Sequence, residues 1–406
     1  MDERIVVVGA GQAGQSLVET LRKKAHSGPI TLIGDEPVAP YQRPPLSKKY
    51  LLGEMSAERL QFRPASYYAE HGIETRFGES VTAIERDAKA VVLGSGECVP
   101  YDLLALTTGS RPRLLPDAIG GGLAGVYPVR TLADVDAMAP EVAEGRRVLI
   151  VGGGYIGLEG AAVAAQRGMR VTLVEMAPRI LARVAAAETA AFFSALHRAH
   201  GVDIVTGTGL ERLEGEDGRV VRAVLSDGRV LAVDLVLVGI GILPNTELAA
   251  AAGLAIDNGI AVDAEGRSSD PAIFAAGDCA SFPYQGRRLR LESVQNAIEQ
   301  AEVAAKAMQG QPQSYAPVPW FWSDQYNVKL QIAGLSQGFD RTLVRPGRGE
   351  RSQSVWYLRD GRLIAVDAMN DPRAYMSGKR WLEAGVSPDL SQLADPEVEL
   401  KTISAT

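Results

Sequence analysis

The stretch RRVLIVGGGYIGLEGAAVAAQRGMRVTLVE, residues 146–175, decides the fold. An apolar strand leads into Gly152, Gly154 and Gly157 at GxGxxG spacing, and the alanine-rich segment that follows predicts a helix. A second apolar strand ends at Glu175. This order is typical of a unit that binds a dinucleotide, because the helix N-terminus presents unpaired N–H groups to a pyrophosphate.

Near the start of the chain, IVVVGAGQAGQSLVETL repeats the pattern, with Gly9, Gly11 and Gly14 between four apolar residues and a helical segment. In such a turn the first glycine permits the tight bend and the second lets backbone approach a pyrophosphate, while the third lets helix and strand pack closely. The sequence therefore predicts two dinucleotide sites in one chain.

Acidic residues end the second strand of each unit. Asp35 and Glu36 follow the first unit, and Glu175 closes the second. A carboxylate at this place accepts hydrogen bonds from ribose hydroxyls and repels a 2′-phosphate. We therefore expect NADH to be preferred over NADPH at the second site, although Arg179 and Arg183 are close enough in sequence to reach a phosphate.

Length and composition bound the class of protein. The chain has 406 residues, 46% of them hydrophobic and 22% charged, which is enough for two or three globular domains. Its net charge of −7 without a lysine-rich tract argues against a nucleic-acid partner. With no long apolar run and no signal-peptide pattern at its start, the chain is expected to be cytoplasmic and not bound to a membrane.

The two cysteines, Cys98 and Cys279, are far apart and lack CxxC or metal-ligand spacing. This spacing argues against a disulfide framework, a redox-active dithiol and a metal site. We expect no bound metal.

Two dinucleotide sites in one chain indicate hydride transfer between a resident and a visiting dinucleotide. Two further strand ends carry glycine turns. One contains Thr108 and Gly109 in YDLLALTTGSRPR, and the other contains Gly277 and Asp278 in IFAAGDCA. Each alone is an ordinary turn.

The segment PYQRPPLSKKYL, residues 40–51, is more specific. It stands where disulfide reductases carry a cysteine pair, and PLSKKYLLG predicts a helix from Ser47. Together with GGGYIGLE, VGIGILPNTELA, IFAAGDCA, ESVQNAIEQA and PWFWSDQ, it resembles the FAD-dependent NADH:ferredoxin reductases of oxygenase systems, the putidaredoxin reductase and biphenyl dioxygenase ferredoxin reductase group. The resemblance covers essentially the whole chain.

The resemblance implies a tightly bound FAD and NADH as substrate. For FAD it implies contacts at Gly9, Gly11, Ala13, Gly14, Asp35, Glu36, Arg43, Lys48, Val81, Thr108, Gly109, Arg130, Gly277, Asp278 and Val294. For NADH it implies contacts at Gly152, Gly154, Tyr155, Ile156, Gly157, Glu159, Glu175, Arg183, Gly239 and Gly241.

The resemblance also implies catalytic residues. Lys48 matches the family lysine near flavin N5, and Glu159 matches the glutamate that faces this lysine and the nicotinamide, so a buried ion pair is expected. Trp320 and Trp322 alternate in an extended segment and should share one face. They are either core anchors or part of an electron path to the ferredoxin.

The implied function is transfer of hydride from NADH to FAD and of single electrons to a [2Fe–2S] ferredoxin that serves a monooxygenase or dioxygenase. Two alternatives stay open: a rubredoxin reductase, and a slow NADH-responsive redox-switch flavoprotein resembling apoptosis-inducing factor. Residues 341–380 carry nine Lys and Arg against four acidic residues, which could steer an acidic ferredoxin. A monomer is expected.

The predicted fold class is α/β, with two Rossmann-like dinucleotide-binding domains in the manner of glutathione reductase and a C-terminal α+β domain. A hairpin is expected at Asp360 and Gly361. The expected domains are the FAD-binding domain in two parts, residues 1–109 and 237–316, the NADH-binding domain, 110–236, and the C-terminal domain, 317–406.

Overall fold

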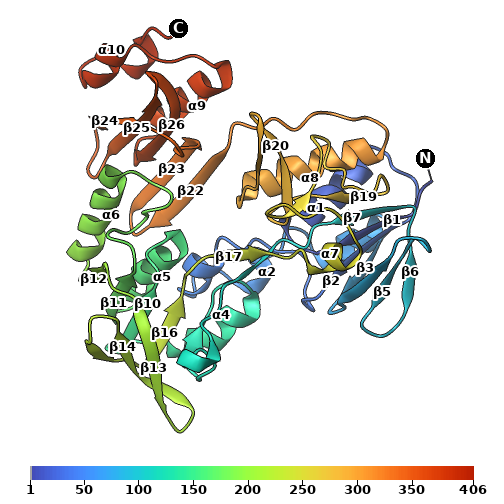
Figure 1. Ribbon diagram of the computed structural model, residues 1–406, viewed down its shortest axis with the longest axis horizontal. Helices are drawn as coiled ribbons and strands as arrows, with labels where there is room; N and C mark the ends of the chain where they lie inside the picture. The colour runs from blue at the N-terminus through green and yellow to red at the C-terminus, as the bar shows by residue number, and fades with distance from the viewer. Residues whose placement is uncertain (1) are drawn as a thin grey trace. The chain divides into compact units, whose positions relative to one another are not determined.

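The computed structural model describes residues 2–406. The chain forms two compact units (Figure 1). Unit 1 consists of Met1–Arg43, Ser56–Arg111 and Ile242–Pro317, and unit 2 of Pro44–Met55, Pro112–Gly241 and Val318–Thr406. The short strands β8 (Ser110–Pro112) and β17 (Ile242–Pro244) lie where the chain passes from one unit to the other.

Unit 1 is built on a five-stranded parallel sheet with the order β19–β7–β1–β2–β3. Its strands are β1 (Ile5–Val8), β2 (Ile30–Gly34), β3 (Ile73–Phe77), β7 (Leu103–Leu106) and β19 (Ile273–Ala275). In the central strand β1, Val6 and Val8 enter one apolar cluster, whereas Ile5 and Val7 enter another. This burial on both faces explains four consecutive β-branched residues.

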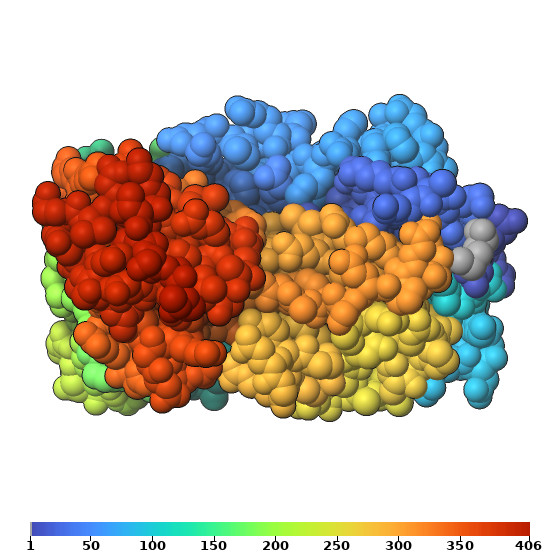
Figure 2. Space-filling view, turned by 90° about the horizontal axis from the view of Figure 1, so that it is seen from above, coloured from blue at the N-terminus to red at the C-terminus, as the bar shows by residue number. Residues whose placement is uncertain are grey.

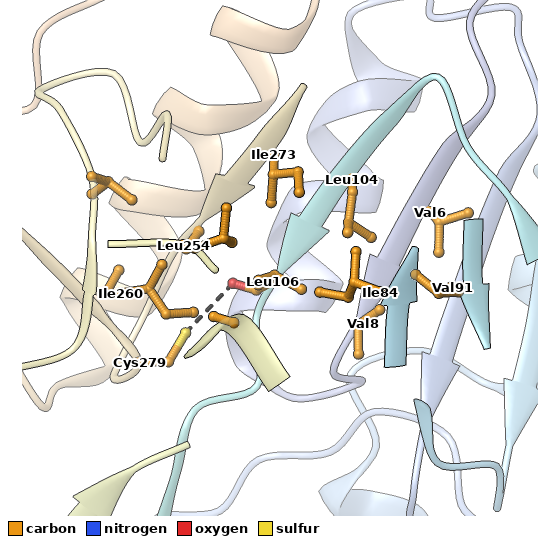
Figure 3. Close-up of a cluster of buried hydrophobic side chains, with 14 of the residues drawn as sticks. Val6, Val8, Ile84, Val91, Leu104, Leu106, Leu254, Ile260, Ile273 and Cys279 are labelled. Atoms are coloured by element: carbon orange, nitrogen blue, oxygen red, sulfur yellow. Dashed lines mark hydrogen bonds between the residues drawn. The ribbon is translucent and has the colours of Figure 1, made fainter. Parts of the chain in front are cut away.

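Helices cover one face of this sheet and strands the other. Helices α1 (Gln12–Lys23) and α8 (Val294–Met308) supply Leu17 and Ala301 to the cluster around Val7. On the opposite face, Ile84 and Val91 approach Val8 (Figure 3). They belong to the antiparallel sheet of β4 (Val81–Glu85), β5 (Ala90–Leu93) and β6 (Cys98–Pro100). The remaining elements are α2 (Ala57–Leu60), α3 (Ala65–Glu70), α7 (Glu247–Ala251), β18 (Ile260–Ala261), β20 (Ala280–Tyr284) and β21 (Arg287–Leu289).

Unit 2 contains a second five-stranded parallel sheet, with the order β12–β11–β10–β16–β9. Its strands are β9 (Val126–Tyr127), β10 (Arg147–Val151), β11 (Arg170–Glu175), β12 (Asp203–Thr206) and β16 (Leu235–Val238). Its helices are α4 (Leu132–Met138), α5 (Tyr155–Gln166) and α6 (Ala187–Ala199). A small antiparallel sheet of β13 (Leu210–Glu216), β14 (Arg219–Leu225) and β15 (Val230–Ala232) shares an apolar cluster with it.

The C-terminal part of unit 2 is a five-stranded antiparallel sheet with the order β22–β23–β26–β25–β24. Its elements are β22 (Trp320–Gln325), β23 (Val328–Gly334), β24 (Arg341–Pro346), β25 (Gln353–Arg359), β26 (Arg362–Met369), α9 (Pro372–Ala384) and α10 (Leu390–Ala394). Asp371 begins α9, because its side chain accepts a hydrogen bond from the backbone of Ala374, and Gly385 ends it in the left-handed conformation. The end of the chain, dark red in Figure 2, lies on the surface.

The α/β fold class is confirmed. The expected hairpin is also present, because Asp360 and Gly361 both have positive φ, as a tight turn between twisted strands requires. The division into four domain segments stays a prediction.

One of the nine basic residues of 341–380, Arg345, is not available to steer a partner. It is only 5% exposed. Its guanidinium donates to backbone carbonyls of residues 392–398, including Leu393 and Asp395. Arg345 therefore holds the C-terminal segment and contributes no surface charge.

Candidate active site

The first glycine turn forms a close junction of β1, α1 and the segment after β7. Gly9 has φ +114°, and a Cβ there would lie 2.2 Å from the Thr107 carbonyl oxygen. A Cβ on Gly14 would lie 2.0 Å from the Gly9 carbonyl oxygen. At Gly11, by contrast, no described atom beyond its chain neighbours lies within 4 Å of that position. The open space is at the N-terminus of α1, where backbone can approach an anion.

Two other predicted positions lie beside this turn. Gly277 approaches α1 so closely that a Cβ would lie 3.1 Å from the Ala13 Cβ, and its N–H donates to Gln300 Oε1 at 2.9 Å. Val294 is the first residue of α8, and Ser293 caps that helix. The structure thus brings Gly9, Ala13 and Gly277 together.

The two other turns of unit 1 are held by hydrogen bonds from side chains and from the backbone. Thr108 Oγ1 donates to the Asn245 carbonyl at 2.8 Å, and the Gly109 carbonyl accepts from the Asn245 N–H at 3.0 Å. Asp278 Oδ2 accepts from Ser110 Oγ at 2.8 Å. These bonds fix both turns at the ends of β7 and β19, near the glycine turn that follows β1.

The acidic strand end of unit 1 has one engaged and one exposed carboxylate. Glu36 accepts from Arg43 Nη2 and from the Tyr41 hydroxyl, each at 2.6 Å, whereas Asp35 is exposed. Arg43 is therefore placed by Glu36. Val81 begins β4 and packs against an apolar cluster, on the strand side of the sheet.

The second glycine turn has the same construction in unit 2. A Cβ on Gly152 would lie 2.4 Å from the Gly239 carbonyl oxygen, and one on Gly157 would lie 2.0 Å from the Gly152 carbonyl oxygen. At Gly154, within residues 2–406, nothing but its neighbours lies within 4 Å of that position. Gly154 is the N-cap of α5, and as a glycine it has no side chain that could cap the helix. Each turn therefore has one glycine with open space beside it, Gly11 in the first turn and Gly154 in the second.

The first residues of α5 differ in environment. The Tyr155 ring packs 4.9 Å from the Phe321 ring, and its hydroxyl is buried without a hydrogen-bond partner among the described residues. Burial raises the pKa of Tyr155 well above its usual range. Ile156 is exposed. Gly241 lies near Arg183, since a Cβ would stand 3.7 Å from its Nη2.

Glu175 holds the second turn from the end of β11. Its Oε2 accepts from the Gly153 N–H at 2.7 Å and its Oε1 from the Ala177 N–H at 2.8 Å. A carboxylate has about four lone-pair sites, so it retains capacity for ribose hydroxyls. Arg179 donates to backbone carbonyls, among them that of Ala182, so it is less available for a phosphate than its sequence position indicates.

Lys48 and Glu159 form a buried ion pair within unit 2, with Lys48 Nζ 2.9 Å from Glu159 Oε1. Ser323 Oγ donates to Oε1 at 2.7 Å and Ser47 Oγ to Oε2 at 2.9 Å. Burial raises the pKa of Glu159, while Lys48 and the two hydroxyls oppose that rise. The expected pair is present.

The segment that carries Lys48 corrects one expectation. Instead of a helix starting at Ser47, there is one short π-helical turn, Leu46–Tyr50. Lys48 interrupts it with the non-helical angles φ −134° and ψ −110°. From this interruption the Lys48 side chain reaches Glu159 on α5.

The two tryptophans of β22 lie near each other, as alternation along a strand predicts. The Trp320 and Trp322 ring centroids are 5.7 Å apart, and Lys379 Nζ lies 5.7 Å from the Trp320 ring centroid. Arg130 precedes α4, and its N–H donates to Asp134 at 3.0 Å.

Sequence reasoning missed Ser47 and Ser323 as partners of Glu159. Each lies within a segment that carries the resemblance, PLSKKYL and PWFWSDQ, and that is the only signal that could have found them. Serine at these positions has no periodicity or spacing that marks it as a partner of a distant carboxylate.

The cysteines do not form a reactive pair. Cys98 is exposed and Cys279 is buried. In Figure 3 the Cys279 thiol points at the Leu106 carbonyl, to which it donates at 3.5 Å. Burial raises the pKa of this thiol, which keeps it protonated. Across the described residues, no cluster of His, Cys, Asp or Glu could hold a metal ion.

Comparison with known proteins identifies the family to which this chain belongs. Residues 3–301 match the family model described as pyridine nucleotide-disulphide oxidoreductase, and residues 320–404 match the reductase C-terminal model. Putidaredoxin reductase of Pseudomonas putida is 44% identical over 410 residues, which cover 100% of this chain and 97% of that protein. The chain belongs to the FAD-dependent NADH:ferredoxin reductases of the pyridine nucleotide-disulphide oxidoreductase family.

Other reductases are similar over most of the chain. A ferredoxin–NAD(P)⁺ reductase of Sphingomonas sp is 44% identical over 404 residues, with 98% of this chain and 96% of that protein covered. The crystal structure of a covalent putidaredoxin reductase–putidaredoxin complex matches with a TM-score of 0.95 and 42% identity, covering 98% of this chain and 97% of that one. A rubredoxin–NAD⁺ reductase of Pseudomonas putida is 36% identical over 371 residues, which cover 91% of this chain and 96% of that protein.

Ferredoxin reductases of this family bind FAD and use NADH, and the two glycine turns fit these dinucleotides. Each leaves a Cβ-sized space at Gly11 or Gly154, where the N–H groups of a 12-residue helix begin. None of the helices in residues 2–406 has the length and apolar character needed to span a bilayer.

Proposed function

We propose that this ferredoxin reductase passes electrons from NADH to a [2Fe–2S] ferredoxin that serves a monooxygenase or dioxygenase. The observation that carries the proposal is its similarity, over nearly the whole chain, to putidaredoxin reductase, including the complex with putidaredoxin. We further propose that the protein is a cytoplasmic monomer and that its domains follow the four segments expected from the sequence.

The glycine turn at Gly11 and the N-terminus of α1 would hold the FAD pyrophosphate, and the turn at Gly154 would hold that of NADH. Asp35, Glu36 and Glu175 would accept hydrogen bonds from ribose hydroxyls. When bound, FAD accepts a hydride from NADH and returns its two electrons one at a time.

Lys48 and Glu159 are the proposed catalytic pair. The Lys48 ammonium would favour negative charge on the reduced flavin. Glu159 would hold this ammonium in place and orient the nicotinamide carboxamide. Burial strengthens both effects, because the side chains are only 17% and 4% exposed.

The tryptophans and exposed arginines of the C-terminal sheet are the proposed contact with ferredoxin. Trp320 and Trp322 would shield the flavin or shorten the electron path. Arg341, Arg359 and Arg362 are exposed around the β25–β26 hairpin and could steer an acidic partner. If both roles hold, W320F or W322F slows ferredoxin reduction, and added salt slows it further.

Rubredoxin is the alternative acceptor, supported by the similarity to a rubredoxin–NAD⁺ reductase. The acceptors are separated by anaerobic reduction of the holoenzyme with NADH, followed by mixing with a [2Fe–2S] ferredoxin or with rubredoxin. Faster bleaching of the ferredoxin supports the proposal. Faster bleaching of rubredoxin contradicts it, and slow reduction of both favours a redox-switch protein like apoptosis-inducing factor.

A further inference from the structure

A line of hydrogen bonds runs from Glu159 into the C-terminal sheet and on to α6. Ser323 Oγ donates to Glu159 Oε1 at 2.7 Å, and Gln325 Nε2 donates to Ser323 Oγ at 3.2 Å. Gln325 Oε1 lies 2.8 Å from His197 Nε2, and the Tyr326 hydroxyl lies 3.3 Å from His197 Nδ1. The line joins α5, β22 and α6.

The middle of this line is fully buried, with Ser323, Gln325 and His197 each 0% exposed. Buried polar side chains require partners, so their hydrogen bonds constrain one another. Burial lowers the pKa of His197 to about 4, which leaves its ring neutral at neutral pH. A neutral imidazole has one donor and one acceptor nitrogen.

These requirements give the line one direction. The Glu159 carboxylate, paired with Lys48, only accepts, so the Ser323 O–H donates to it and Ser323 Oγ accepts from the Gln325 amide N–H. The Gln325 side-chain oxygen then accepts from His197 Nε2–H. His197 Nδ1 is left to accept from the Tyr326 hydroxyl. Donors aligned in series strengthen one another.

We propose that Gln325 and His197 are positioning residues for Glu159, because they fix the Ser323 hydroxyl as a donor to its carboxylate. The consequence for hydride transfer rests on the proposed function of Glu159. The charged side chain against this carboxylate is Lys48, from the π-helical turn. The side chain that faces it from β22 is the neutral Ser323.

The line orients Glu159 and does not conduct protons. A carboxamide does not readily gain and release a proton at neutral pH, and the Gln325 amide lies between His197 and Ser323. Removal of His197 or of Ser323 should therefore change the ionisation of Glu159 and not the supply of protons.

The test is the ionisation of Glu159 in the FAD-loaded protein without NADH or ferredoxin. Its carboxyl band is isolated by subtracting the infrared spectrum of E159Q and is followed against pH. We expect S323A to raise the midpoint by about one pH unit, a tenfold change in the acid constant, since a donor to the carboxylate is lost. Q325M and H197F should raise the midpoint by less. H197Q keeps an N–H donor to Gln325 and should have the parent midpoint.

Ser354 provides the matched control. It is also 0% exposed in the same sheet, and its hydroxyl oxygen accepts from Trp356 Nε1 at 3.0 Å. S354A should leave the midpoint unchanged. If S323A fails to fold, S323C gives the same direction, since a thiol is a weaker donor.

Equal midpoints in S323A, Q325M and S354A would overturn the proposal. Shifted midpoints with unchanged reduction of FAD by NADH would leave the positioning role in place. In that outcome the proposed catalytic role of Glu159 fails, so the two ideas are separable.

Discussion

Lys48 and Glu159 are joined at 2.9 Å although they belong to different elements, a short π-helical turn and α5. In K48M the carboxylate stays buried without its cation, which should lower the free energy of unfolding by about 3 kcal/mol at pH 8. The double variant K48M/E159Q should recover most of this loss, because no charge is then buried. Urea unfolding followed by tryptophan fluorescence measures it, and a double variant no more stable than K48M would contradict it.

The two glycines of the second turn should respond differently to alanine. G154A fills the space meant for a pyrophosphate, so we expect the KM for NADH to rise about tenfold with an unchanged thermal midpoint. G157A forces a Cβ to within 2.0 Å of the Gly152 carbonyl oxygen and should destabilise the fold. Equal thermal losses in both variants would show that Gly154 is structural.

The two corresponding glycines of the first turn, Gly11 and Gly14, should show the same contrast for FAD binding. G11A meets no described atom within 4 Å beyond its neighbours, whereas G14A meets the Gly9 carbonyl at 2.0 Å. We expect purified G11A to be folded by circular dichroism but to contain much less FAD than the parent. G14A should be poorly soluble. A G11A protein with full flavin content would mean that FAD does not approach this backbone.

Preference for NADH should depend on Glu175. E175Q keeps the shape of the side chain and one of its two backbone hydrogen bonds but removes the charge that repels a 2′-phosphate, so kcat/KM for NADPH should rise about tenfold relative to NADH. R183Q is the companion variant, and it should lower the use of NADPH only. Steady-state assays with both nucleotides measure the ratio, and an unchanged ratio in E175Q would assign the preference elsewhere.

Two buried groups should give opposite dependences of stability on pH. Burial lowers the pKa of His197 from 6.5 to about 4, so stability from this group is lost as pH falls from 6.5 to 4. Burial raises the pKa of Asp367 from 3.8 to about 6, so stability from that group is lost as pH rises from 3.8 to 6. Between pH 4 and 6 the two contributions oppose each other.

Variants separate these contributions. H197Q should lose about 3 kcal/mol of stability from pH 4 to 6, whereas D367N should gain about 3 kcal/mol over the same range. The four tryptophans are Trp320, Trp322, Trp356 and Trp381, so fluorescence reports the C-terminal sheet and α9. Parallel pH profiles in both variants would refute the two pKa directions.

The glycine turns could be predicted from sequence because their spacing is local and the steric demand acts over a few residues. The Lys48–Glu159 pair could be predicted only through family resemblance, since no local pattern joins a short turn to a distant helix. Ser323 and Gln325 could not be predicted, because polar residues in a strand are usually exposed. The burial of Arg345 could not be predicted either, because a count of charged residues does not show which of them are buried.

The most direct measurement is NADH-driven cytochrome c reduction by the purified flavoprotein, with and without an added [2Fe–2S] ferredoxin. We expect strong stimulation by the ferredoxin and little activity with NADPH. Rapid reduction of the flavin by NADH without any stimulation by ferredoxin would contradict it.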